Sequence, residues 1–131
     1  MAFHWHIDSK AKLILGSAAG VLTSSDLLNY LKTIAGVNAL EYRQLLDLSQ
    51  AIPEITLTEA VEIGVRIRML RGDVVAGPAA IVMPKEQAEP LARMLGIMAM
   101  AHHPLRLFKD LELAKKWIDG FATQQSANAP G

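Results

Sequence analysis

The sequence has no cysteine and no excess of charge of either sign, and each absence excludes a class of protein. Without cysteine, disulfide scaffolds, cysteine-based zinc sites and thiol nucleophiles are excluded, and the composition suits a reducing cytoplasm. Thirteen Lys and Arg balance thirteen Asp and Glu, so no general positive field attracts phosphate groups. Nucleic acid is therefore not an expected partner. No apolar run approaches the roughly 20 residues that a transmembrane helix needs, so no transmembrane segment is predicted.

Aromatic residues are also scarce, at 5%, although hydrophobic residues make up 51% of the chain. The interior must therefore be built mainly from Leu, Ile, Val, Ala and Met. A chain of 131 residues fits one domain with a single core. We expect this domain to span residues 1–122. Residues 123–131 are polar, small and aperiodic, which predicts a flexible C-terminal tail.

The N-terminal segment alternates like a strand with one buried face. Phe3, Trp5 and Ile7 are separated by His4 and His6, and a turn follows. Residues 12–21 then read as a second strand, which predicts an antiparallel hairpin. The segment 16–20 contains two glycines, which favour a strand bulge or close backbone packing.

The rest of the chain alternates between strand and helix patterns. Strands are predicted over 40–48, 79–83 and 104–108, and helices over 23–36, 56–71, 85–101 and 111–121. The first helix is expected to start at a capping box and to stop at Gly36. Residues 51–54 are predicted to form a loop, because Pro53 cannot donate to a strand ladder. This order predicts a single α/β domain with a mixed, mostly parallel sheet of about five strands and about four helices.

One stretch in the middle of the chain is the most informative for function. An apolar run ends in Asp47-Leu48-Ser49, and the next helix opens with Thr56-Leu57-Thr58-Glu59, a capping box. A strand ending in this way before a capped helix is typical of a parallel-strand crossover. We therefore expect a binding or regulatory surface around Asp47, Ser49, Thr56 and Thr58.

With its hairpin, the Leu45–Ser49 stretch ahead of a helix and the apolar strand 79–83, the chain resembles the SpoIIAA-like group, which shares its fold with the STAS domain. The closing segment also resembles that group, because a strand ending in Phe108 leads to a helix that ends in Ala-x-x-Trp-Ile. The resemblance covers residues 3 to 120, and the order of the elements carries most of its weight.

The resemblance implies a protein-binding switch, because the anti-sigma-antagonist branch is phosphorylated on Ser in an Asp-Ser-Ser-Gly stretch at this helix start. This chain has Ile-Thr-Leu-Thr-Glu there, without the glycine or the serine pair. Thr56 and Thr58 are the hydroxyls placed to inherit such a phosphate, which helix amides would stabilise. The alternative is that Thr56 is an ordinary helix cap and Thr58 an ordinary first-turn residue.

No constellation of catalytic or metal-binding residues follows from the sequence. His4 and His6 share one strand face and could approach His102 and His103, but no carboxylate or other third ligand is brought to either pair. No Ser, His and acid are spaced as a catalytic relay. We therefore predict no catalytic residues, no metal site, no cofactor and no enzyme.

The sequence thus predicts a non-enzymatic regulatory or protein-interaction module. The alternative is a carrier of a small apolar ligand or lipid, bound between the sheet and the helices. A protein partner of unknown identity is expected. Self-association as a homo-oligomer, through an edge strand or apolar helix faces, is also compatible with the pattern.

Overall fold

A five-stranded sheet forms the middle layer of the protein, for which a computed structural model describes residues 2–71, 77–83 and 105–128. The strands are β1 (Ala2–Asp8), β2 (Leu13–Thr23), β3 (Arg43–Glu54), β4 (Ala79–Val82) and β5 (Leu105–Phe108). They lie side by side in chain order. β1 and β2 are antiparallel, and the remaining neighbours are parallel. The prediction of a mixed, mostly parallel sheet is confirmed.

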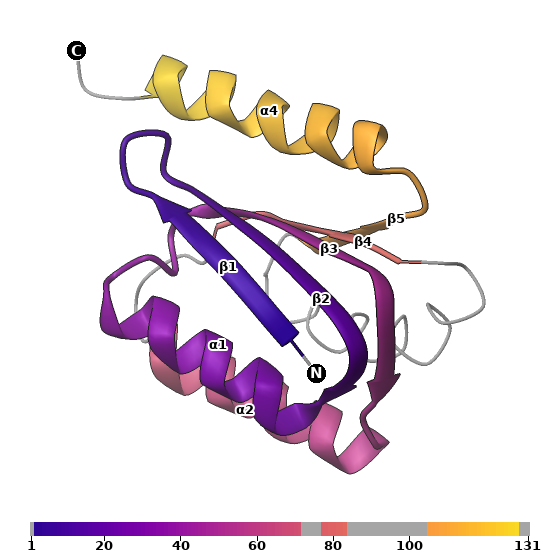
Figure 1. Cartoon of the computed structure of the whole chain (residues 1–131). Helices are drawn as coiled ribbons and strands as arrows, with labels where there is room; N and C mark the ends of the chain where they lie inside the picture. Colours follow the sequence, from indigo (N-terminus) through magenta and orange to yellow (C-terminus); the bar gives the residue numbers. More distant parts are fainter. Residues whose placement is uncertain (1, 72–76, 84–104, 129–131) are drawn as a thin grey trace.

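Helices cover both faces of this sheet (Figure 1). Helices α1 (Ser24–Gly36) and α2 (Leu57–Arg71) lie together on one face, and α4 (Leu111–Asn128) lies on the other. Three of the four predicted helices are present in the described part of the chain. The fourth, expected over 85–101, lies outside the described residues.

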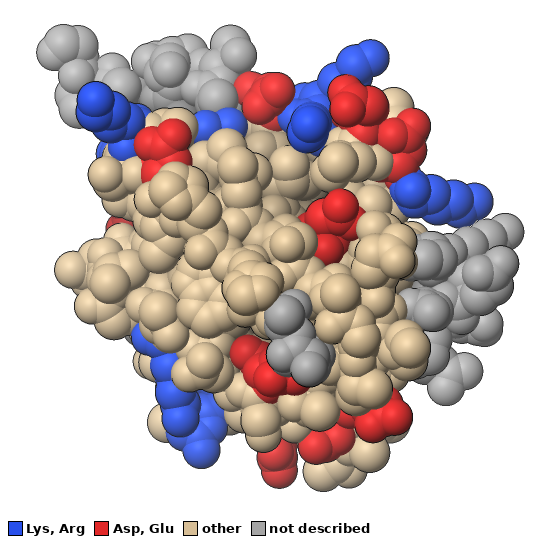
Figure 2. All heavy atoms as spheres, in the orientation of Figure 1, with Lys and Arg blue, Asp and Glu red and all other residues tan. Residues whose placement is uncertain are grey.

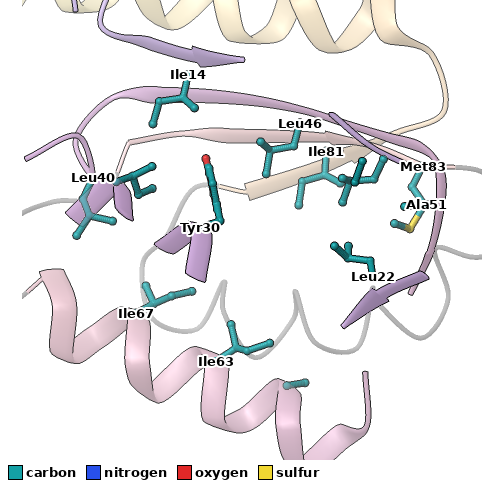
Figure 3. Packing of buried hydrophobic residues seen from close by; sticks show 14 of the residues in the cluster. Ile14, Leu22, Tyr30, Leu40, Leu46, Ala51, Ile63, Ile67, Ile81 and Met83 are labelled. Carbon is teal, nitrogen blue, oxygen red and sulfur yellow. The ribbon is translucent and has the colours of Figure 1, made fainter. Parts of the chain in front are cut away.

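The hydrophobic core has two parts, one on each face of the sheet. The part under α1 and α2 is the larger, and Figure 3 shows side chains from the sheet and both helices meeting there. A smaller cluster, including Leu45, Ala114 and Ile118, joins the sheet to α4. Every residue of β4 is buried, as its all-apolar sequence predicted.

Tyr30 and Arg43 make specific hydrogen bonds in the described core, although Arg43 Nε is buried there without a hydrogen-bond partner. The Tyr30 hydroxyl on α1 donates to Gln44 Oε1 at 2.7 Å, and burial raises the pKa of Tyr30. The Arg43 guanidinium, 6% exposed, donates to the carbonyl oxygens of Ala11 at 2.8 Å and Ile118 at 3.3 Å. Arg43 therefore connects the hairpin turn, the start of β3 and α4.

The predicted loop over 51–54 is wrong, because β3 continues through it to Glu54. Beyond Asp47, β3 pairs with β2 but not with β4, and Pro53 lies opposite Leu22. A proline in a strand is tolerated where its missing N–H can face a side without a strand partner. The strand therefore extends five residues past Ser49.

One helix end is confirmed and another differs from the prediction. α1 ends at Gly36, as predicted, and the left-handed residue that follows it is Asn38, with a φ of 60°. α4 runs to Asn128, so the tail expected from Thr123 is helical up to that residue. The segment 123–128 contains no proline, and a polar stretch can continue a helix once packing of the preceding turns has started it.

Candidate protein-interaction surface

Two helix N-termini lie at the same edge of the sheet. β2 and β3 are parallel and end in register, with Thr23 opposite Glu54, so α1 and α2 both begin beyond that edge. At the start of α1 the Thr23 N–H donates to Asp26 Oδ2 at 2.9 Å, and the Asp26 N–H donates to Thr23 Oγ1 at 3.3 Å. This reciprocal pair is the predicted capping box, and it is confirmed.

The start of α2 repeats the arrangement with different residues. The Thr56 N–H donates to Glu59 Oε1 at 2.9 Å, and the Glu59 N–H donates to Thr56 Oγ1 at 3.1 Å. The second oxygen of Glu59, Oε2, accepts a hydrogen bond from the Ser24 hydroxyl on α1 at 2.8 Å. One carboxylate therefore caps α2 and ties it to α1.

The hydrogen bonds to Glu59 favour its charged form. The backbone N–H of Thr56 is the largest contribution that lowers the pKa of Glu59, followed by the hydroxyls of Ser24 and Thr56, and desolvation opposes them. The carboxylate also lies in the first turn of α2, where the helix dipole favours negative charge.

Thr56 and Thr58 are both exposed at this helix start. The Thr56 oxygen accepts from a helix amide, which is the capping role. Thr58 lies one residue beyond Leu57, the first residue of α2, so its hydroxyl is in the first turn and exposed to solvent. Their phosphorylation stays a prediction.

Asp47 and Ser49 lie elsewhere, within β3 and not in a loop. Asp47 Oδ1 accepts from the Ser49 N–H at 3.1 Å and from the Ser49 hydroxyl at 2.6 Å. Here Leu48 and Ser49 lie opposite Ala18, where the register of β2 and β3 shifts, so the motif forms a β-bulge. The predicted irregularity in the glycine-containing segment of β2 lies at the same position.

The structure does not bring the four predicted residues into one surface. Leu46 and Leu48 both enter the core under α1 and α2, so the Asp47 side chain points to the opposite face of the sheet. Six residues of mostly extended chain, 50–55, lie between Ser49 and Thr56, a span of about 20 Å. Thr56 and Thr58 therefore belong to the helix-start surface, and Asp47 and Ser49 to the other sheet face.

The main feature that sequence reasoning missed is an exposed apolar row along α2, named here the α2 stripe. Its members are 44 to 69% exposed and recur every four residues: Leu57, Val61, Val65 and Met69. The opposite side of α2 places Ala60, Ile63 and Ile67 in the core. The spacing was visible in the sequence, but apolar residues on both sides of a helix do not reveal which side is buried.

Only two of the four histidines lie in the described part of the chain. His4 and His6 are exposed on one face of β1, as the alternation predicted, whereas His102 and His103 lie outside the described residues. Among the residues that the structure describes, no group of three or more His, Asp or Glu could hold a metal ion. None of the described helices combines the length and apolarity needed to cross a membrane.

Solved structures that are similar to this chain include two at 16% identity. An uncharacterised protein of the DUF3478 family with a SpoIIAA-like fold, from Shewanella loihica PV-4, matches with a TM-score of 0.57 over 89% of this chain and 92% of that chain. The anti-sigma factor antagonist SpoIIAA in its unphosphorylated form matches with a TM-score of 0.52 over 92% of this chain and 97% of that chain. No family model and no curated protein matches the sequence. The structural likeness shows that the chain has a SpoIIAA-like, STAS-like fold.

Proposed function

We propose that this chain is a non-enzymatic regulatory module that binds a protein partner along α2. The observation that carries the proposal is the α2 stripe, which leaves four large or medium apolar side chains in water. Contiguous exposed apolar side chains on a soluble domain mark interaction sites. The similarity to SpoIIAA, which is named an anti-sigma factor antagonist, supports a regulatory role through the shared fold.

The chemistry of α2 favours a partner with an apolar groove or an amphipathic helix. Side chains at intervals of four on a helix form one continuous row, which is the pattern that groove-binding helices present. Glu62, Arg66 and Arg68 are exposed on the same helix. Charges of both signs beside an apolar row suit a protein surface with a polar rim.

The helix-start residues place a regulatory position beside this row. A phosphate on Thr58 would add about 1.5 to 2 negative charges next to Leu57 and would change how a partner docks. Thr56 is less suited, because a phosphate there would disturb the amide contact of Thr56 Oγ1 and would approach the Glu59 carboxylate. Asp47 and Ser49 are left out of the proposed surface because the sheet separates them from α2.

Nothing in the described residues favours the alternative of an apolar-ligand carrier. The space between the sheet and the helix pair is filled by side chains such as Ile14, Leu22 and Ile63, which are at most 2% exposed (Figure 3). A carrier needs a concave, mostly apolar cavity for its ligand.

Affinity purification from the native host tests the proposal. Val61→Glu combined with Val65→Glu should abolish recovery of a partner that the wild-type chain recovers, because two carboxylates would be buried in the interface. Leu113→Glu is the matched control, since Leu113 is 54% exposed on α4 and lies on the other side of the sheet. Equal recovery by all three chains, with unchanged melting temperatures, would contradict a docking role for α2.

A further inference from the structure

β1 is an outer strand without the usual protection against pairing. It spans Ala2–Asp8 and, in the described part of the chain, pairs with β2 alone. In outer strands, lysine, proline, a bulge or a short length normally prevents pairing with a strand of another chain. Residues 3–7 of β1, Phe-His-Trp-His-Ile, include none of these. β5, the opposite outer strand, has four residues and carries the exposed Arg106.

The surface around the middle of β1 carries little positive charge. In the view of Figure 1 β1 lies in front, and Figure 2 shows the same side with Lys and Arg at its margins and mostly uncharged atoms, with some Asp and Glu, in its middle. Leu15, on the neighbouring strand, is 43% exposed. The whole chain has a formal net charge of zero, so two copies do not repel each other at long range.

We propose that β1 pairs with β1 of a second copy of this chain, antiparallel and about a two-fold axis through Trp5. A two-fold interface requires a surface that is complementary to itself, and a strand without Lys, Arg, Asp or Glu over residues 3–7 and with an open row of N–H and C=O groups meets that requirement. Trp5 is the midpoint of Ala2–Asp8, so this register pairs the strand over its full length. The two sheets would then form one continuous sheet.

This register sorts the side chains of β1 by chemistry. Phe3, Trp5 and Ile7 stay on the face that packs against the helices. There the ring centroids of Phe3 and Trp5 lie 5.1 and 5.2 Å from the ring centroid of Tyr30. His4 and His6 lie on the other face. His4 of one copy falls opposite His6 of the other, so four imidazoles meet around the axis.

The cluster of imidazoles makes the association sensitive to acid. Imidazoles gain positive charge between about pH 8 and pH 5, and like charges opposite each other destabilise a strand pair. On the same face, β1 carries Asp8 and the neighbouring β2 residues Leu15 and Ser17 are uncharged. The nearest charge across β2 is Asp47, opposite Ser17. The dimer has four such carboxylates, but none lies directly opposite an imidazole, whereas His4 of one copy and His6 of the other are direct neighbours, with Cα atoms about 4.5 to 5.5 Å apart.

Sedimentation analysis of the full chain tests the association. Small interfaces associate weakly, so the scan covers about 1 to 500 µM, with a chelator present. The expected result is a dimer at pH 7.5 whose dissociation constant rises at least about tenfold at pH 5.5. His4→Gln with His6→Gln should keep the dimer at both pH values. His4→Lys with His6→Lys should be monomeric at both, with an unchanged melting temperature.

Cysteine cross-linking tests the register. Because the chain has no native cysteine, every disulfide that forms involves an introduced cysteine. Residues directly opposite in an antiparallel pair have Cα atoms about 4.5 to 5.5 Å apart, within reach of a disulfide. A mixture of His4→Cys and His6→Cys chains should cross-link under mild oxidation far more than either chain alone. A chain that is monomeric throughout, a dimer unaffected by pH, or preferential cross-linking within one variant would overturn the proposal. The result is independent of the partner proposed for α2, because β1 and the α2 stripe share no residue.

Discussion

Thr56 and Thr58 are two residues apart, yet their oxygens have different environments. The Thr56 oxygen accepts from the Glu59 amide, whereas Thr58 is an exposed residue of the first turn. We expect Thr56→Ala to lower the free energy of unfolding by about 1 kcal/mol, the usual cost of a lost N-cap. Thr58→Ala should change it by less than about 0.5 kcal/mol. Urea denaturation of both variants measures the difference, and equal losses would contradict the capping assignment.

At the residue scale, the sequence predicted local roles well where neighbours in the chain decide them. Both capping boxes were recognised because their partners are three residues apart. The environment of Asp47 was not predictable in this way. The strand continues past it only because β2 supplies a partner through Glu54, and β2 is distant in sequence.

At the scale of elements, the Glu59 carboxylate caps α2 and accepts a hydrogen bond from Ser24 on α1. Its contribution to stability depends on pH. The pKa of Glu59 in the folded chain lies below the ordinary value of 4.5, so the unfolded chain binds more protons in that range. The resulting stabilisation is present above about pH 4.5 and is lost as the pH falls through the lowered pKa. Glu59→Gln should therefore show a shallower loss of stability on acidification than the wild type.

Thermal or urea unfolding between neutral pH and pH 3 measures this effect. Glu62→Gln is the control, because it removes a carboxylate from an exposed position of the same helix. The control should retain the wild-type loss of stability. An identical acid profile for Glu59→Gln and the wild type would show that the hydrogen bonds of the Glu59 carboxylate, to Thr56 and to Ser24, contribute nothing to the pH dependence.

The faces of α2 show what a single element cannot reveal from its own sequence. Leu57, Val61 and Val65 are exposed, and Ile63 and Ile67 are buried, although all five are apolar. The periodicity predicted a helix. The choice of buried face was made by α1 and the sheet, which pack against one side.

At the scale of the whole molecule, Arg43 joins parts that are far apart in the chain. Its two donated hydrogen bonds reach the hairpin turn and the last helix. We expect Arg43→Met to lower the free energy of unfolding by about 2 to 4 kcal/mol, because the carbonyl oxygens of Ile118, which is buried, and Ala11 lose a charged donor. Asp119→Asn is the control, with an expected change below about 1 kcal/mol, since the Asp119 side chain is 76% exposed and 3.9 Å from Arg43.

Equilibrium denaturation followed by circular dichroism measures both variants. Equal stability of Arg43→Met and the wild type would contradict the connecting role. A large loss of stability in Asp119→Asn would show instead that the ion pair between Arg43 and Asp119 makes the connection.

By itself, the sequence determined the order of the described strands and helices, the parallel crossovers, the two capped helix starts and the burial of β4. These features depend on periodicity and on contacts within a few residues. Only the tertiary structure decided that β3 runs through Pro53, that Asp47 and Thr56 lie on different surfaces, and which side of α2 faces water. Each of these depends on a partner element distant in sequence, because backbone pairing and side-chain burial are satisfied between elements and not within one.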